Sequence, residues 1–126
     1  MLTTAQIAQL TGFALLLSAG QILFKKVAHL PAPLASIPGM TALLANVWFW
    51  LALALYGVAT LLWIMILQKV PLSLAYPFAA LGFVIVPLAS WLLMGETLSP
   101  LYCAGIALII AGILVVAFSA SGAVHG

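Results

Sequence analysis

The chain has 126 residues, of which 67% are apolar and 3% are charged, and its ionic side chains are three lysines and one glutamate. A soluble domain carries about 25% charged residues, so this composition excludes a soluble enzyme, a nucleic-acid-binding protein and a disordered tail. The single cysteine, Cys103, excludes an internal disulfide and a multi-cysteine metal site. The sequence therefore predicts an integral membrane protein with no metal, no cofactor and no nucleic-acid partner.

Four segments are long and apolar enough to cross a bilayer, because a hydrocarbon core of about 30 Å needs about 20 apolar residues in a helix. They are residues 5–28, 47–67, 72–94 and 101–118. The first segment has no basic start and no small-residue cleavage site, so we expect a retained helix and not a signal peptide. The sequence predicts an all-α membrane protein whose residues 1–126 form one four-helix transmembrane domain.

Prolines and polar residues mark the breaks between these spans. The longest break, residues 29–46, contains three prolines, and we expect a short interfacial helix at about residues 40–45. Residues 68–71 and 95–100 form two shorter turns. Inside the third span, we expect Pro87 to kink the helix, since the carbonyl group that it leaves unbonded needs a neighbouring helix or a polar cavity.

The lysines specify the membrane orientation only weakly. Cytoplasmic loops normally carry the excess of basic residues, but Lys25 and Lys26 end the first span while Lys69 lies on the opposite side. Two interpretations remain open. Either a partner protein fixes one orientation, or the chain inserts in both.

Polar side chains on the first span are the main candidates for function, because polar groups inside a bilayer are costly. Ser18, Gln21 and Lys25 follow i, i+3, i+7 spacing and share one helix face. A stripe of an amide and an ammonium group suits an anionic phosphate or a sugar hydroxyl. Lys26 is explained equally well by an interface anchor and by a further phosphate contact.

Aromatic and acidic residues form a second set of candidates. Tyr56 and Trp63 share a face of the second span, and Tyr76 lies near the start of the third. Aromatic residues at this spacing more often pack than bind, and an interfacial belt also explains Tyr76. Glu96, the only acid, is expected to favour the start of the fourth helix, with a substrate contact as the alternative. No nucleophile has a histidine and an acid nearby, so no enzyme chemistry is predicted.

Small residues form a strip along the fourth span. Gly105 and Gly112 lie seven residues apart, and the strip is widened by Ala104, Ala107 and Ala111. Small residues let helix backbones approach closely, which is how helices associate in lipid. Because four helices hardly surround a substrate path, we predict that this strip pairs two chains. Packing within one chain is the alternative.

Three motifs in this order resemble the small multidrug resistance family of the drug/metabolite transporter superfamily. They are Pro71-x3-Ala75-Tyr76, Gly95-Glu96-Thr97-Leu98-Ser99-Pro100 and Gly105-x6-Gly112. Drug exporters of that family couple transport to protons through a glutamate in the first helix, and matching Gly20 and Lys25 places Leu17 at that position. A leucine exchanges no proton, so the resemblance does not support proton-coupled export of lipophilic cations.

A closer resemblance is to the subunits of the aminoarabinose-phosphoundecaprenol flippase and their small relatives. It rests on Ala19-Gly20-Gln21-x3-Lys25, Leu62-Trp63, Leu67-Gln68-Lys69-Val70-Pro71, Ala75-Tyr76-Pro77 and Ser99-Pro100. The resemblance implies transport of a polyprenyl-phosphate-linked sugar across the bacterial inner membrane. It also implies two paired four-helix subunits, alike or different, as an eight-helix dimer. In that unit Lys25, helped by Gln21 and Lys26, is predicted to hold the phosphate.

The remaining predictions concern the substrate path and the alternatives to it. Tyr56, Trp63 and Tyr76 are predicted to line the sugar or prenyl path, and Pro87 to allow the bend of alternating access. The first alternative is an exporter of small organic cations or polyamines, which requires an acid such as Glu96 in its path. The second is a non-transporting accessory subunit of a membrane glycosyltransferase.

Overall fold

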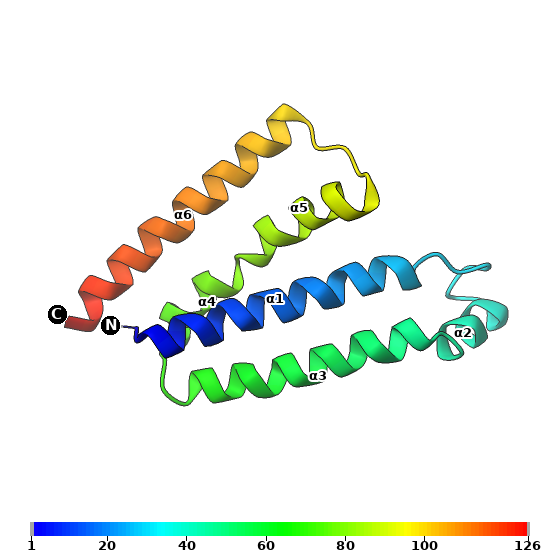
Figure 1. The fold of residues 1–126 in the computed structure, drawn as a ribbon, viewed down its shortest axis with the longest axis horizontal. Helices are drawn as coiled ribbons and strands as arrows, with labels where there is room; N and C mark the ends of the chain where they lie inside the picture. The colour runs from blue at the N-terminus through cyan, green and yellow to red at the C-terminus, as the bar shows by residue number, and fades with distance from the viewer. Residues whose placement is uncertain (1, 126) are drawn as a thin grey trace.

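The structure, a computed structural model, describes the backbone of residues 2–125 and the side chains of residues 2–119. Its helices are α1 (Thr4–Val27), α2 (Ile37–Leu44), α3 (Val47–Leu67), α4 (Leu72–Ala79), α5 (Gly82–Met94) and α6 (Pro100–His125) (Figure 1). The segments long and apolar enough to cross a membrane are Thr4–Val27, Val47–Leu67, Leu72–Met94 and Pro100–Ser119. The predicted all-α architecture with four spans is confirmed, and α2 is the short helix expected after the first span.

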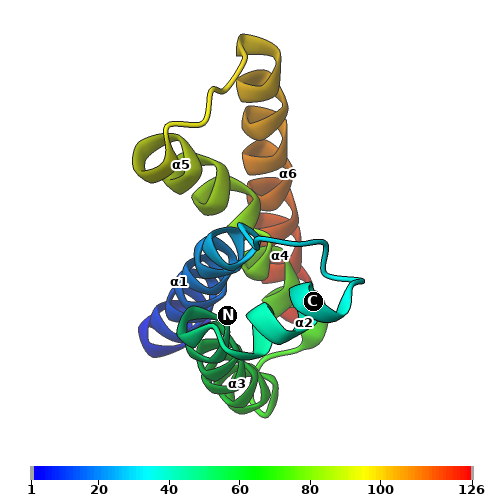
Figure 2. The same ribbon diagram turned by 90° about the vertical axis from the view of Figure 1, so that its right-hand side faces the viewer.

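The pair α1 and α3 is the best-packed part of the molecule. The two helices run antiparallel and side by side in both views (Figures 1 and 2). Leu10 and Phe13 of α1 join Ala59 and Ile66 of α3 in one buried cluster. Phe13 stacks on Trp63 with the ring centroids 4.6 Å apart. Since lipid tails are as apolar as these side chains, close packing and not removal from water holds the two helices together.

A glycine lets α1 approach one aromatic ring of α3. A Cβ atom on Gly20 would lie 2.5 Å from Cε2 of Tyr56, closer than real Cβ contacts come. The same ring lies beside Phe24, with 5.2 Å between the centroids. These contacts hold Tyr56 between the helices and bring its phenol group to the face of α1 that carries Gln21.

Side-chain caps fix where the first three helices begin. Thr3 and Gln6 form a capping box at the start of α1. Ser36 caps α2 and Asn46 caps α3, each by accepting a hydrogen bond from a backbone N–H in the first turn. The breaks between the spans are therefore set by local polar chemistry, as the sequence predicts.

The start of α6 differs from the prediction. Ser99 caps this helix, because its Oγ accepts a hydrogen bond of 3.1 Å from the backbone N–H of Tyr102. Glu96, the residue expected to favour the helix start, lies outside the cap and next to Gly95. That glycine ends α5 in the left-handed conformation, with φ at +68°. The carboxylate of Glu96 is turned toward α1 and not toward α6.

The third span is broken between α4 and α5, and the kink expected from the sequence at Pro87 stays a prediction. Pro87 lies inside α5, whereas the helix stops at residues 80–81. A proline ring clashes with the carbonyl group four residues earlier, which here belongs to Phe83 in the first turn of α5. The break beside Gly82 therefore lies N-terminal of the turn that Pro87 affects (Figure 1).

α6 diverges from the other spans. Its C-terminal part contacts α4, whereas its N-terminal part stands away from α1 and α3 (Figures 1 and 2). Among the side chains that the structure describes, none in Pro100–Ser119 is buried. This divergence opens the molecule toward the membrane on the side where the candidate residues of α1 lie.

Candidate functional site

A groove of about 620 Å³ lies between α1, the α4–α5 break and α6. We call it the central groove. Its walls are mainly apolar, with Leu17 from α1, Phe83 and Val86 from α5, and Ile106 and Ile109 from α6. The polar residues that line it are Ser18, Gln21 and Tyr102. A largely apolar groove with a few polar side chains is typical of a binding site for an amphipathic ligand.

Ser18 contributes little hydrogen-bonding capacity to this groove. Its side chain is buried, and its Oγ donates a hydrogen bond of 2.7 Å to the carbonyl oxygen of Ala14. Such a bond to the preceding turn satisfies a hydroxyl group inside a membrane helix. The structure therefore places this predicted site residue in the groove but engages its proton elsewhere.

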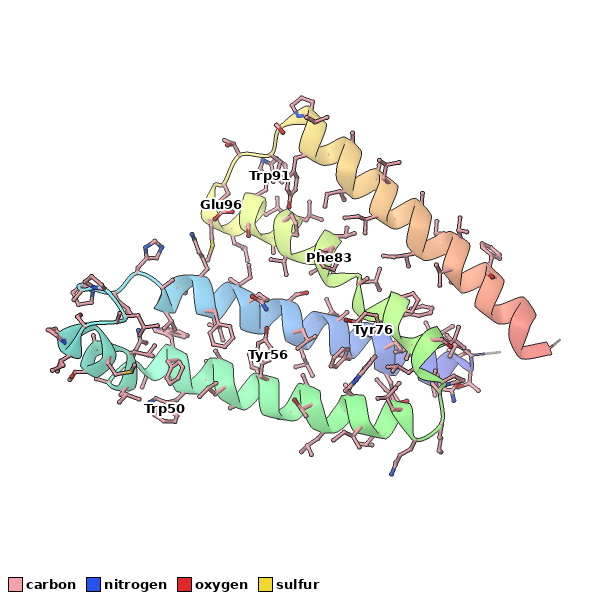
Figure 3. The ribbon with its side chains drawn as sticks, turned by 180° about the vertical axis from the view of Figure 1, so that it is seen from behind. Trp50, Tyr56, Tyr76, Phe83, Trp91 and Glu96 are labelled. Atoms are coloured by element: carbon pink, nitrogen blue, oxygen red, sulfur yellow. The ribbon has the colours of Figure 1, made fainter. Side chains whose placement is uncertain are left out.

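Gln21 and Tyr56 form the polar centre of the site. The Nε2 of Gln21 donates a hydrogen bond to the phenolic oxygen of Tyr56, which reaches across from α3 (Figure 3). Among the side chains of residues 2–119, the amide oxygen and the phenolic hydrogen have no further partner. An amide oxygen accepts and a phenol donates, so the pair can bind a ligand that carries hydroxyl groups.

Lys25 lies one helical turn beyond Gln21 on the same face of α1, as predicted, but it is paired. Its Nζ is 4.0 Å from Oε1 of Glu96, and both side chains are about half exposed, at 52% and 46%. Figure 3 shows Glu96 in the segment between α5 and α6, on the side where α1 ends. The ion pair connects the end of α1 to the α5–α6 segment, and Lys25 does not line the central groove itself.

Lys26 belongs to a different face of the molecule. Its Nζ lies 4.9 Å from the ring centroid of Trp48, at the start of α3. It lines a second groove of about 560 Å³ between α1 and α5, which we call the lateral groove. Adjacent residues on a helix point about 100° apart, so the two lysines diverge and do not form the joint phosphate site predicted from the sequence.

Trp63 and Tyr76 lie together in a smaller hollow of about 270 Å³. Trp63 is held there by its stack on Phe13, whereas Tyr76 is 66% exposed. Leu17 and Phe83 line both this hollow and the central groove, so the two cavities adjoin each other. The packing interpretation suits Trp63, and the surface interpretation suits Tyr76.

The small residues of α6 are not used for packing within the described part of the chain. A Cβ atom on Gly105 or Gly112 would have no neighbour within 4 Å. Ala104 and Ala111 are exposed, and Gly105 lines the central groove. The pairing of two chains through this strip stays a prediction.

Sequence reasoning missed Tyr102. The residue lies on the same face of α6 as Gly105 and Ile109, at i, i+3 and i+7 spacing, and all three line the central groove. That spacing was the signal available in the sequence. Among the described residues, no three His, Cys, Asp or Glu side chains gather in a way that could hold a metal ion.

Comparison with known proteins places the chain in a family. The family described as putative transmembrane family 234 matches residues 14–117. The chain is 37% identical over 78 residues to the probable 4-amino-4-deoxy-L-arabinose-phosphoundecaprenol flippase subunit ArnE of Pseudomonas savastanoi pv. phaseolicola, covering 62% of this chain and 68% of that relative. It is 42% identical over 73 residues to proteins of the same name from Salmonella paratyphi B and Salmonella typhimurium, covering 58% of this chain and 66% of each relative. No solved structure matches the chain.

The fold and these comparisons define the class of protein. The four apolar spans make the chain a multi-pass membrane protein. The chain belongs to putative transmembrane family 234, and it spans about two thirds of the length of the curated relatives that it matches. The resemblance to the aminoarabinose-phosphoundecaprenol flippase subunits, predicted from its motifs, is confirmed.

Proposed function

We propose that this chain is a subunit of a flippase that moves a polyprenyl-phosphate-linked sugar, of the undecaprenyl-phosphate type, across the bacterial inner membrane. The names of the curated relatives support this substrate class. The structural observation that carries the proposal is Gln21, held by Tyr56, in the wall of an otherwise largely apolar groove. A sugar headgroup supplies the hydroxyl groups that such a polar site needs inside a membrane.

The shape of the central groove suits a ligand with one polar end. Only the headgroup of a lipid-linked sugar must be screened from hydrocarbon, because its apolar prenyl tail can remain in the hydrocarbon core. The divergence of α6 leaves the groove open, and its apolar walls at Phe83 and Ile106 offer the tail a surface that resembles lipid. The sugar would contact Gln21 and Tyr102 while the tail extends between α5 and α6.

Lys25 provides the cation for the phosphate. An anion at the edge of the hydrocarbon needs a positive partner, and Lys25 lies one turn from the proposed sugar contact at Gln21. Its present partner is Glu96, in an ion pair that is half exposed. Exposed pairs of this kind contribute about 0.2–1 kcal/mol, so a phosphate with charge-assisted hydrogen bonds can displace the carboxylate. Binding of the headgroup would then release the α5–α6 segment from the end of α1.

A second four-helix chain, alike or different, would complete the unit. The strip with Gly105 and Gly112 is open to a partner in the described structure. A partner helix on this strip would close the outer side of the central groove, which α6 alone leaves open. The predicted eight-helix dimer therefore fits the side of the molecule that is least packed.

The alternative of a cation or polyamine exporter gains no support from the groove. Such a transporter needs a carboxylate in its path, and the only acid of the sequence is Glu96. Glu96 is paired with Lys25 and does not line the central groove.

Reconstituted vesicles provide the test. The purified chain, alone and with a related four-helix subunit, is placed in vesicles that contain a polyprenyl-phosphate-linked sugar, and accessibility of the sugar to an external reagent gives the flipping rate. Lys25→Gln is expected to lower the rate at least about tenfold, a loss of about 1.4 kcal/mol. Lys69→Gln removes the same charge at the other end of α3 and is expected to leave the rate unchanged.

Two outcomes would contradict the proposal. Equal rates in wild type and Lys25→Gln would remove the phosphate site. No flipping by the wild type in either arrangement, together with co-purification of a membrane glycosyltransferase, would favour the accessory-subunit alternative.

A further inference from the structure

The lateral groove is a second site whose lining differs from that of the central groove. From α1 it takes Leu15, Ala19, Ile22 and Lys26, at i, i+4, i+7 and i+11 spacing. From α5 it takes one apolar stripe, which consists of Ile85, Ala89 and Leu93. Each stripe contains one small side chain, Ala19 in α1 and Ala89 in α5. The two stripes thus make a furrow along the α1–α5 pair.

The length of this furrow corresponds to one leaflet. Leu15 and Lys26 are eleven residues apart, which is about 16 Å along a helix at 1.5 Å per residue. Half of a hydrocarbon core of about 30 Å is about 15 Å. A chain that lies in the furrow therefore runs from the surface of the membrane to its middle and ends there.

The polar end of the furrow is a single cation. Lys26 is the only charged residue in the lining, and its ammonium lies 4.9 Å from the ring centroid of Trp48. Lysine and tryptophan together are typical of the level of the lipid headgroups. Ser18 also borders the furrow, but its hydroxyl proton is engaged by the carbonyl group of Ala14. The lining thus offers a charge contact at the surface and no set of hydrogen-bonding groups for a sugar.

We propose that the lateral groove binds one anionic glycerophospholipid, with its phosphate at Lys26 and one acyl chain between α1 and α5. The single cation at headgroup level matches the phosphate, and the one-leaflet length matches an acyl chain. A lipid-linked sugar fits this site less well, because its sugar would find no polar partner and its prenyl tail is longer than the furrow. The bound lipid fills the space between α1 and α5 and holds α5 in place beside the central groove.

The test measures lipid binding and does not depend on transport. The full-length chain is purified in a mild detergent with equal amounts of phosphatidylglycerol and phosphatidylcholine that carry the same acyl chains, and native mass spectrometry counts the lipids retained. A lysine near the membrane surface contributes about 1 kcal/mol toward an anionic lipid, so wild type is expected to retain phosphatidylglycerol about fivefold more than phosphatidylcholine.

Two variants locate the site. Lys26→Gln is expected to abolish the preference for phosphatidylglycerol, whereas Lys69→Gln, the same change at the other end of α3, is expected to keep it. Ala89→Phe places a large side chain in the α5 wall of the furrow and is expected to reduce retention of both lipids. Ala89→Phe tests the furrow even if Lys26→Gln is poorly folded.

Three results would overturn the proposal. The first is an unchanged preference in Lys26→Gln, and the second is an equal loss in Lys69→Gln, which would indicate general attraction by net charge. The third is stoichiometric displacement of phosphatidylglycerol by undecaprenyl phosphate, which would assign the lateral groove to the transport substrate.

Discussion

The pair α1–α3 and the helix α6 are both apolar spans, yet the structure packs them in opposite ways. In α1 and α3, a buried cluster, a stacked aromatic pair and a close glycine contact bring the backbones together. In the described part of α6, no side chain is buried and two glycines face open space. Apolar composition therefore specifies that a segment spans the membrane, whereas small residues, aromatic stacks and hydrogen bonds decide what it packs against.

Because of this difference, the α1–α3 pair and α6 would have different roles in binding. The α1–α3 pair holds Gln21 and Tyr56 in fixed positions, as a polar site inside lipid requires. α6 supplies the opposite wall of the central groove and the strip that a second chain would cover. The α1–α3 pair would define what is bound, and α6 would define how a substrate or a partner reaches the groove.

We expect the largest loss of stability from a substitution at the close contact between α1 and α3. In Gly20→Ala the added methyl group meets the ring of Tyr56 at 2.5 Å, so the ring or the helices must shift. Overpacking of this kind costs about 1–3 kcal/mol. Gly57→Ala in α3 is the matched control, because a Cβ there has no neighbour within 4 Å, and it is expected to stabilise by up to about 1 kcal/mol. Unfolding in mixed micelles, followed by tryptophan fluorescence, measures both free energies of unfolding, and equal values would contradict the close packing of α1 against Tyr56.

A smaller effect is expected from the polar pair. Gln21→Leu and Tyr56→Phe each remove the hydrogen bond between α1 and α3, and such bonds inside membranes contribute about 0.6 kcal/mol. The double variant is expected to lose no more stability than either single variant, because both remove the same interaction. The same unfolding measurement checks this prediction. Additive losses would show that the two side chains act independently.

We expect the smallest loss of stability from breaking the ion pair between the end of α1 and the α5–α6 segment. Glu96→Gln leaves Lys25 without its carboxylate, and we expect a loss below about 1 kcal/mol, since both groups are half exposed. The same variant is expected to bind undecaprenyl phosphate more tightly than wild type, because the phosphate no longer competes with a carboxylate. Native mass spectrometry with undecaprenyl phosphate measures this affinity. Weaker binding in Glu96→Gln would mean that the acid takes part in the site.

The sequence predicts the spans well because their length and their breaks are local properties. The four segments, the helix α2 and the common face of Ser18, Gln21 and Lys25 follow from hydropathy, caps and helical spacing. The partners of those side chains do not follow, because they come from distant parts of the chain. Tyr56 lies 35 residues from Gln21, and Glu96 approaches Lys25 only through the fold of α5.

Two differences from the sequence predictions have local physical reasons. Lys25 and Lys26 are adjacent in sequence, but the helix turns Lys25 toward Glu96 and Lys26 toward the lateral groove and Trp48. The break in the third span lies at residues 80–81, next to Gly82, and glycine favours helix weakly. The first difference could have been predicted from a helical wheel, because adjacent helical residues point about 100° apart.

The most direct test of the central claim is to find where the substrate binds. A polyprenyl-phosphate-linked sugar that carries a photoreactive group on the sugar is cross-linked to the full-length chain in vesicles, and the adducts are mapped by mass spectrometry. The account predicts adducts on residues of the central groove, such as Phe83, Tyr102 and Ile106, and competition by unlabelled substrate. Adducts confined to the lateral groove, at Leu93 or Ile85, or labelling that unlabelled substrate does not reduce, would contradict it.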